Sequence, residues 1–257
     1  MQHVRSKDGT SIAYEKTGQG PDLIIIGGAL GDHRFYIPLA TELAKHFTVY
    51  NFDRRGRGQS GDTQPYSVER EVEDVAALIA AASQPVFVYG HSAGSALALR
   101  TAAAGLKIKK LALADPPYGR HSDTDDAAKA RQAETAAKIQ SFHDNGDHRG
   151  AAAFFLSGFG LPSEAVEEML DSPAGETMID SARALPYDYA IVGDGLVPNE
   201  LAARAAMPTL ILAAETAPET AKALVGIMPS AKLQTMTAST HDLAPTEIAR
   251  VVTPFFT

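Results

Sequence analysis

Ser92 stands between two glycines in the segment Gly90-His91-Ser92-Ala93-Gly94. A serine hydroxyl is a weak nucleophile near neutral pH, so it needs a neighbouring base, and the base needs an acid that orients it. The residues before this segment, 86–89, are apolar and β-prone, and residues 95–100 continue in a helical pattern. A serine at a tight turn from strand to helix has the context of a nucleophile elbow. The flanking glycines suit such a turn because they lack a Cβ. We therefore predict that Ser92 is a nucleophile.

His241 is the predicted general base. It lies in a loop just after the last predicted strand, and both the serine and the candidate acids precede it in the chain. That order, serine, acid and histidine, is the one found when a nucleophile elbow carries a triad. The other seven histidines lie at a terminus, in a loop, at a helix end, within the elbow or in the predicted insertion: His3, His33, His46, His91, His121, His143 and His148. Of these, His91 lies within the elbow, and its side chain should point away from Ser92.

Asp115 is the predicted acid of this arrangement. It follows the predicted strand 110–114 and precedes Pro116-Pro117, which fix the direction of the chain beyond the carboxylate. A turn-forming aspartate before proline is the structural alternative. Glu215, which follows the predicted strand 208–214, is the alternative acid. Asp188 and Asp194 are further alternatives, whereas Asp242 is too close in sequence to reach the His241 ring.

A glycine-rich loop, residues 27–32, follows the apolar run 22–26, which is typical of a strand buried in a parallel sheet. The loop lacks the spacing of a phosphate-binding P-loop or of a dinucleotide fingerprint. We expect it instead to provide an oxyanion donor through the backbone N–H of Ala29. The N–H of Ala93, at the start of the helix after Ser92, is the expected second donor.

These features together resemble the α/β-hydrolase superfamily. The elbow 90–94, the late His241 and the segment Asp53-Arg54-Arg55-Gly56-Arg57-Gly58-Gln59-Ser60 carry the resemblance, the last being similar to the superfamily's Asp-x-Arg-Gly-x-Gly-x-Ser turn. The resemblance implies an α/β-hydrolase fold, a Ser-His-acid triad and a structural role for residues 53–60.

Two positions depart from the superfamily pattern. Gly27-Gly28 replaces the usual His-Gly, so the oxyanion loop is assigned by position. Ala217 stands where the superfamily usually has its acid. Haloalkane dehalogenases are similar to this chain in having an acid after the preceding strand, which corresponds to Asp115. Because those enzymes have an aspartate where this chain has Ser92, dehalogenation is a disfavoured reaction for this chain.

The remaining pattern predicts an α/β fold with a mostly parallel, doubly wound sheet, because strand and helix patterns alternate. Residues 119–204 lack a strand pattern and contain helical patterns at 125–142, 149–155, 163–171 and 175–185. We therefore expect a hydrolase core formed by 1–118 and 205–257 and a helical cap formed by 119–204. The candidate pocket residues are Leu30, His91, Phe155, Phe159 and Tyr187.

Composition narrows the function further. The chain has 257 residues, 45% of them hydrophobic, no cysteine and a formal net charge of −8. The charge argues against nucleic acid or an anionic membrane as a partner. The absence of cysteine excludes disulfides and thiolate metal sites, and residues 1–6 show no apolar signal core. We expect a cytoplasmic monomer or homodimer that needs no metal or cofactor.

The functional prediction is a serine hydrolase that cleaves a carboxylic ester or lactone of a small molecule through an acyl-enzyme. One alternative keeps the site and changes the chemistry to that of a cofactor-free haloperoxidase or a carbon–carbon bond hydrolase. A second alternative is a non-catalytic ligand-binding protein on a hydrolase scaffold.

Overall fold

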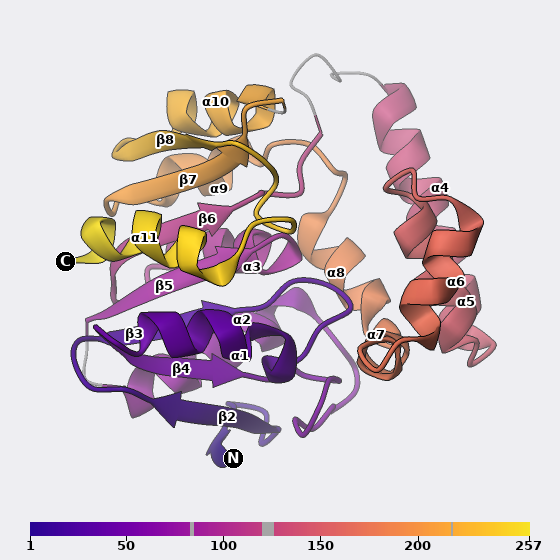
Figure 1. The fold of residues 1–257 in the computed structure, drawn as a ribbon, viewed down its shortest axis with the longest axis horizontal. Coiled ribbons are helices and arrows are strands. Elements are labelled where there is room, and N and C mark those ends of the chain that lie inside the picture. The colour runs from indigo at the N-terminus through magenta and orange to yellow at the C-terminus, as the bar shows by residue number, and fades with distance from the viewer. Residues whose placement is uncertain (83–84, 120–125, 217) are drawn as a thin grey trace.

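A single sheet organises the computed structural model, which describes residues 1–82, 85–119, 126–216 and 218–257. Within these ranges the sheet has eight strands in the order β1-β2-β4-β3-β5-β6-β7-β8 (Figure 1). β2 is antiparallel to β1 and β4, and all other neighbours are parallel. This confirms the predicted α/β fold with a mostly parallel sheet. The strands are β1 (Gln2–Arg5), β2 (Ser11–Thr17), β3 (Asp22–Ile26), β4 (Thr48–Phe52), β5 (Val86–His91), β6 (Ile108–Ala114), β7 (Thr209–Ala214) and β8 (Ala231–Met236).

Helices cover both faces of the sheet. α1 (His33–Leu43) and α11 (Pro245–Phe256) share an apolar cluster with one face. α2 (Val68–Ala81), α3 (Ala93–Ala103) and α10 (Pro218–Ile227) pack on the other face. β3 and β5 are buried along their whole length, which explains why their sequences read as continuous apolar runs. None of the helices in the described ranges combines the length and apolarity needed to cross a membrane.

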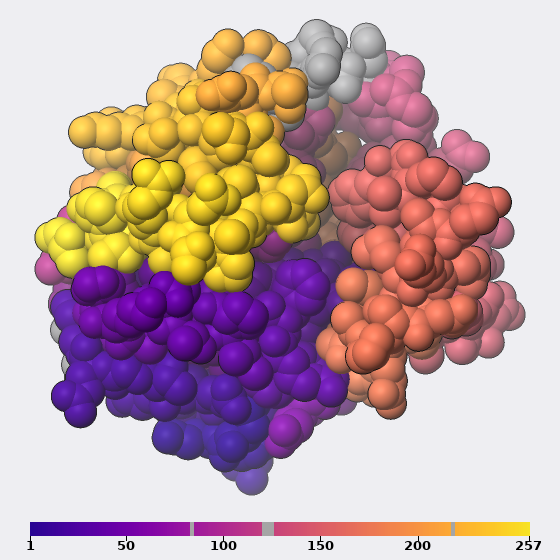
Figure 2. All heavy atoms as spheres, viewed as in Figure 1, coloured from indigo at the N-terminus to yellow at the C-terminus, as the bar shows by residue number. Residues whose placement is uncertain are grey.

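The described part of the segment between β6 and β7 contains helices and no strand. The predicted cap contains α4 (Asp126–Asp144), α5 (His148–Ser157), α6 (Ser163–Asp171), α7 (Gly175–Ala182), α8 (Leu185–Val192) and α9 (Asn199–Arg204). α4–α7 form a unit beside the core (Figures 1 and 2), with an apolar cluster that also takes in Leu30. The sequence patterns did not predict α8 and α9 as separate helices. Ile191 and Ala202 from these two helices pack in the core cluster, so the chain returns to the core before residue 204.

Residues 53–60 form a structured turn, as the resemblance implied. The Asp53 carboxylate accepts hydrogen bonds from the backbone N–H groups of His33 and Gln59, both at 2.8 Å. Ser60 Oγ donates to the Asp53 carbonyl oxygen at 2.6 Å. Gly58 has a φ of 49°, and a Cβ at this position would overlap the Asp53 carboxylate. Gly58 and Ser60 of the motif therefore stabilise the turn itself.

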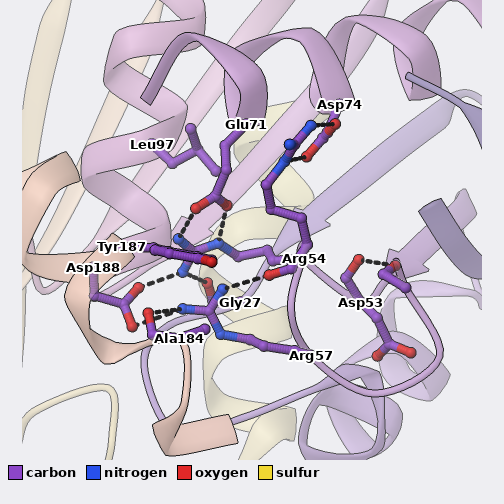
Figure 3. Close-up of polar contacts among 12 residues, drawn as sticks. Gly27, Asp53, Arg54, Arg57, Glu71, Asp74, Leu97, Ala184, Tyr187 and Asp188 are labelled. Carbon is purple, nitrogen blue, oxygen red and sulfur yellow. Dashed lines mark hydrogen bonds and ion pairs between the residues drawn. The ribbon is translucent and has the colours of Figure 1, made fainter. Parts of the chain in front are cut away.

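The arginines of this turn are buried and paired with carboxylates (Figure 3). Arg54 donates to both carboxylate oxygens of Glu71, on α2, and at 2.7 Å to Asp188, on α8. Arg57 donates to the other oxygen of Asp188, also at 2.7 Å. Arg55 makes a similar two-point contact with Asp74. These guanidinium groups are thus committed to holding α2 and α8 against the turn, not to binding phosphate.

We expect Asp188→Asn to lower the free energy of unfolding by about 3 kcal/mol or more, because it leaves two buried guanidinium groups with one carboxylate fewer. Urea titration at neutral pH measures this difference. Asp171→Asn is the matched control, since Asp171 pairs with Arg149 on an exposed surface of the cap. That change should lower the free energy by at most about 1 kcal/mol. Similar losses in the two variants would contradict the role assigned to Asp188.

Candidate active site

Ser92 lies at the junction of β5 and α3 in a strained conformation. Its φ is 51° and its ψ is −124°, and its backbone N–H donates to the Ala114 carbonyl at 2.9 Å. Gly94 makes this turn possible, because a Cβ there would overlap the carbonyl oxygens of Ile26 and Gly27. A non-glycine residue in such a backbone conformation costs about 1–3 kcal/mol and is found mostly at functional sites.

The loop after β3 lies directly against this elbow. A Cβ on Gly28 would come within 3.1 Å of Ser92 Cβ. The next residue, Ala29, is half-buried, and its backbone N–H has no hydrogen-bond partner within the described ranges; the same holds for the N–H of Ala93. Free backbone N–H groups beside a nucleophile are what an oxyanion hole requires. Leu30 has a φ of 55°, which turns the chain sharply after these groups.

His241 lies in the loop between β8 and α11. Its ring packs against the ring of His91, with centroids 4.3 Å apart, and its side chain is 41% exposed. His91 directly precedes Ser92, so the histidine is brought to the elbow. Among the described residues no hydrogen bond joins Ser92 Oγ to His241. Such bonds are often long before substrate binds.

Asp115 follows β6 with a φ of 44°. Its Oδ2 lies 3.4 Å from His241 Nδ1. The same oxygen accepts hydrogen bonds from Ser239 Oγ at 2.6 Å, Thr240 N–H at 2.6 Å and Thr240 Oγ1 at 2.7 Å. Ser239 Oγ is also 2.9 Å from His241 Nδ1. With the Ser239 hydrogen directed to the carboxylate, the Nδ1–H of His241 donates to Ser239 Oγ, which bridges the imidazole and the carboxylate.

The charge state of Asp115 follows from these contacts. Burial alone would raise its pKa, but the interactions with His241, Ser239 and Thr240 outweigh burial and lower the pKa to about 2. The carboxylate is therefore ionised at neutral pH. It favours the Nδ1–H tautomer of His241, which leaves Nε2 of that ring free to accept a proton.

The other acid candidates lie elsewhere. Glu215 is exposed and has no side-chain hydrogen bond or ion pair within the described part of the chain. Asp188 is held by Arg54 and Arg57, and Asp194 is exposed, with its carboxylate accepting from the N–H of Leu196. Asp242 is also exposed. Ala217, where the resemblance expects an acid, lies outside the described residues.

The candidate pocket residues have different surroundings. Phe159 is 63% exposed, with its ring centroid 6.5 Å from that of His241, and Phe155 packs edge-on against Phe159. Leu30 is buried in the cap cluster, and His91 is buried beside His241. Tyr187 stacks on Tyr66 and bonds to Asp62 and Gln64. Its contacts thus give no support to a pocket role.

Sequence reasoning did not single out Ser239, Thr240 or Tyr36. Ser239 and Thr240 bond Asp115, and Tyr36 bonds the Gly28 N–H. The run of hydroxyl residues before His241 was the available signal for the first two. No local signal marks Tyr36, because its partners are distant in the sequence.

Two clusters of metal-ligand types occur among the described residues, namely His91 with Asp115 and His241, and Asp32 with His33 and Asp53. In the first, Asp115 is satisfied by protein donors, as described above. In the second, His33 Nδ1 bonds Asp53 at 2.7 Å and Asp32 bonds Arg34. Both arrangements are explained by side-chain hydrogen bonding.

The sequence matches the model of the alpha/beta hydrolase family over residues 23–252. The crystal structure of an alpha/beta hydrolase from Sphaerobacter thermophilus DSM 20745 is 40% identical, with a TM-score of 0.87 over 100% of both chains. An enol-lactonase from Burkholderia xenovorans LB400, 19% identical with a TM-score of 0.68 over 99% of both chains, is similar in fold.

Curated relatives match over shorter segments. A pimeloyl-[acyl-carrier protein] methyl ester esterase from Stenotrophomonas maltophilia (strain R551-3) is 38% identical over 112 residues, which is 42% of this chain and 42% of that protein. The uncharacterized hydrolase YraK of Bacillus subtilis (strain 168) is 33% identical over 95 residues, or 35% of each chain. The chain thus matches less than half the length of these relatives.

Proposed function

This chain belongs to the alpha/beta hydrolase family, and on that premise we propose that it is a serine hydrolase that cleaves a carboxylic ester or a lactone. The main support is the meeting of three chain segments: the elbow with Ser92, the end of β6 with Asp115, and the loop with His241. An esterase among the partial relatives is consistent with this chemistry.

The proposed reaction begins when Ser92 Oγ attacks the carbonyl carbon and its proton passes to His241 Nε2. The oxyanion of the tetrahedral intermediate accepts hydrogen bonds from the N–H groups of Ala29 and Ala93. His241 then returns the proton to the leaving alkoxide, and the alcohol departs from an acyl-Ser92 intermediate. Water, deprotonated by the same histidine, attacks the acyl carbonyl carbon. His241 then returns that proton to Ser92 Oγ as the carboxylic acid departs. Asp115 stabilises the imidazolium form of His241 in both halves.

The cap is proposed to supply the pocket for the apolar part of the substrate. In the space-filling view a furrow separates the cap helices from the core (Figure 2). Phe159 belongs to the segment after α5, and its exposed ring lies with its centroid 6.5 Å from that of the His241 ring. Phe155 packs edge-on against Phe159.

We expect Ser92→Ala to lower turnover by about 10³-fold or more while the protein stays folded, because the nucleophile is gone. Turnover is measured on a panel of p-nitrophenyl esters and lactones, together with mapping of the adduct of a fluorophosphonate probe. Ser141→Ala, at an exposed serine of α4, is the control and should keep both activity and labelling. Labelling at a residue other than Ser92 would contradict the proposal.

The same panel separates the alternatives. A wild-type protein that turns over none of these compounds, and that the probe does not label, would favour the ligand-binding alternative. Faster cleavage of a 1,3-diketone than of any ester would favour carbon–carbon bond hydrolysis, which uses the same residues.

We expect Asp115→Asn to lower kcat/KM by about 10²–10⁴-fold, because the neutral amide no longer stabilises the imidazolium or fixes its tautomer. Glu215→Gln is the matched control and should change kcat/KM by less than about 3-fold, since loss of an exposed, unpaired carboxylate alters little. Circular dichroism and thermal unfolding verify that both variants are folded. The reverse ranking would assign the acid to Glu215.

We expect Phe159→Ala to lower kcat/KM for a p-nitrophenyl octanoate by about 5–20-fold and for the acetate by less than about 2-fold. The reason is that the octanoyl chain loses its apolar contact with the Phe159 ring, which contributes about 1–2 kcal/mol to binding. Ile37→Ala, at an exposed apolar residue of α1, is the control and should affect both esters equally. Equal loss on both esters in Phe159→Ala would remove this residue from the pocket.

A further inference from the structure

The hydroxyl of Tyr36 joins the two segments that the proposed reaction needs most. It accepts a hydrogen bond from the backbone N–H of Gly28 at 2.7 Å, next to the proposed oxyanion donor Ala29. On its other side it lies 2.9 Å from Nδ1 of His91, the residue before Ser92. Tyr36 comes from α1 and is 6% exposed, so water does not compete for these contacts.

The glycine pair after β3 is shaped around this tyrosine. A Cβ on Gly27 would lie 2.6 Å from Cε2 of the Tyr36 ring. A Cβ on Gly28 would crowd the Tyr36 hydroxyl at 3.4 Å and Ser92 Cβ at 3.1 Å. The departure from the His-Gly pattern therefore has a physical reason, because the first glycine leaves the room that the ring fills.

The direction of the second hydrogen bond follows from the first. Because the Gly28 N–H already occupies the Tyr36 oxygen as a donor, the phenol hydrogen is free for His91 Nδ1, which accepts it. Burial lowers the pKa of His91 to about 3, and nearby His241 acts in the same direction. Burial also raises the pKa of Tyr36 to about 12. Both groups are neutral at neutral pH, so His91 carries its proton on Nε2.

His91 in turn supports the base. Its neutral ring packs against His241 with centroids 4.3 Å apart and planes tilted by 47°. A neutral neighbour does not repel the imidazolium that His241 becomes during the reaction, whereas a protonated one would. The Nε2 atom of His91 is buried and has no partner among the described residues, so the tyrosine contact is the side-chain hydrogen bond that fixes this ring.

We propose that Tyr36 and His91 are positioning residues, and that the chain Gly28 N–H to Tyr36 hydroxyl to His91 Nδ1 fixes the oxyanion loop against the elbow and holds the neutral ring that supports His241. The kinetic consequence rests on the proposed function. Loss of the Tyr36 hydroxyl removes the hydrogen bond that holds the Gly28 N–H, so the position of the adjacent Ala29 N–H is no longer fixed. A displaced oxyanion donor weakens transition-state binding more than substrate binding.

The test is Tyr36→Phe, which removes the hydroxyl and keeps the ring. We expect kcat to fall about 10–100-fold, less than for removal of an oxyanion donor, with KM within about 2-fold. Tyr89→Phe is the matched control, because Tyr89 is buried on β5 and its hydroxyl has no partner in the described part of the chain. It should keep the wild-type kcat. Rates are normalised to folded protein measured by near-ultraviolet circular dichroism.

A second readout does not depend on activity. In ¹⁵N-labelled protein, nitrogen chemical shifts should show His91 as the Nε2–H tautomer, with an Nδ1 shift that changes in Tyr36→Phe and stays in Tyr89→Phe. A protonated Nδ1, or an Nδ1 shift that Tyr36→Phe leaves unchanged, would overturn the proposal. So would a kcat within about 2-fold of wild type in Tyr36→Phe. If the wild-type protein hydrolyses no ester, the proposed function fails and the nitrogen shifts alone decide on this hydrogen-bond chain.

Discussion

The close approach of two backbone segments at Gly94 is the constraint on which the candidate site depends. The first turn of α3 lies so near the carbonyl oxygens of Ile26 and Gly27 that no side chain fits between them. The elbow and the loop after β3 are therefore packed directly against each other, which brings the proposed oxyanion donors Ala29 and Ala93 into two adjoining segments. The sheet register reinforces this, since Ile26 pairs with Gly90. The strained backbone of Ser92 is thus surrounded by close backbone contacts, which is the setting in which such strain persists.

The buried arginines extend that constraint to the cap. Arg54 reaches Glu71 on α2 and Asp188 on α8, and its Nη1 also approaches the Gly27 carbonyl at 3.4 Å (Figure 3). Leu30, two residues beyond Gly28, packs in the apolar cluster of the cap. The loop after β3 thus contacts the elbow through Gly28 and the apolar cluster of α4–α7 through Leu30. Ala29, the proposed oxyanion donor, lies between these two contacts in the sequence.

Local patterns predicted much of this fold and less of the site. The bounds of β3 and α6 follow from runs and breakers that are visible in the sequence. The elbow was readable because strand, glycines and helix are contiguous. The helices α8 and α9 could not be predicted in this way. They are short and depend on packing against α3, and α8 depends also on the Arg54–Asp188 ion pair, whose partners are 134 positions apart in the sequence. Tyr36 is 55 positions from His91 and was missed for the same reason. Side chains that act through distant partners leave no periodic signal.

The position of Asp115 explains how a carboxylate after β6, and not after β7, can serve as the proposed acid. β6 is the immediate neighbour of β5, and His91 pairs with Ala114, so Asp115 emerges level with Ser92. β7 lies one strand further away and ends at Ala214. An acid after β6 therefore needs the histidine loop to fold back over the sheet. Here the loop does so and binds the carboxylate with its own backbone, through the N–H of Thr240. The hydrogen bonds that place the acid also place the histidine, because Ser239, Thr240 and His241 are consecutive. What the chemistry constrains is the position of a carboxylate relative to Nδ1, and the loop supplies that position whichever strand carries the acid.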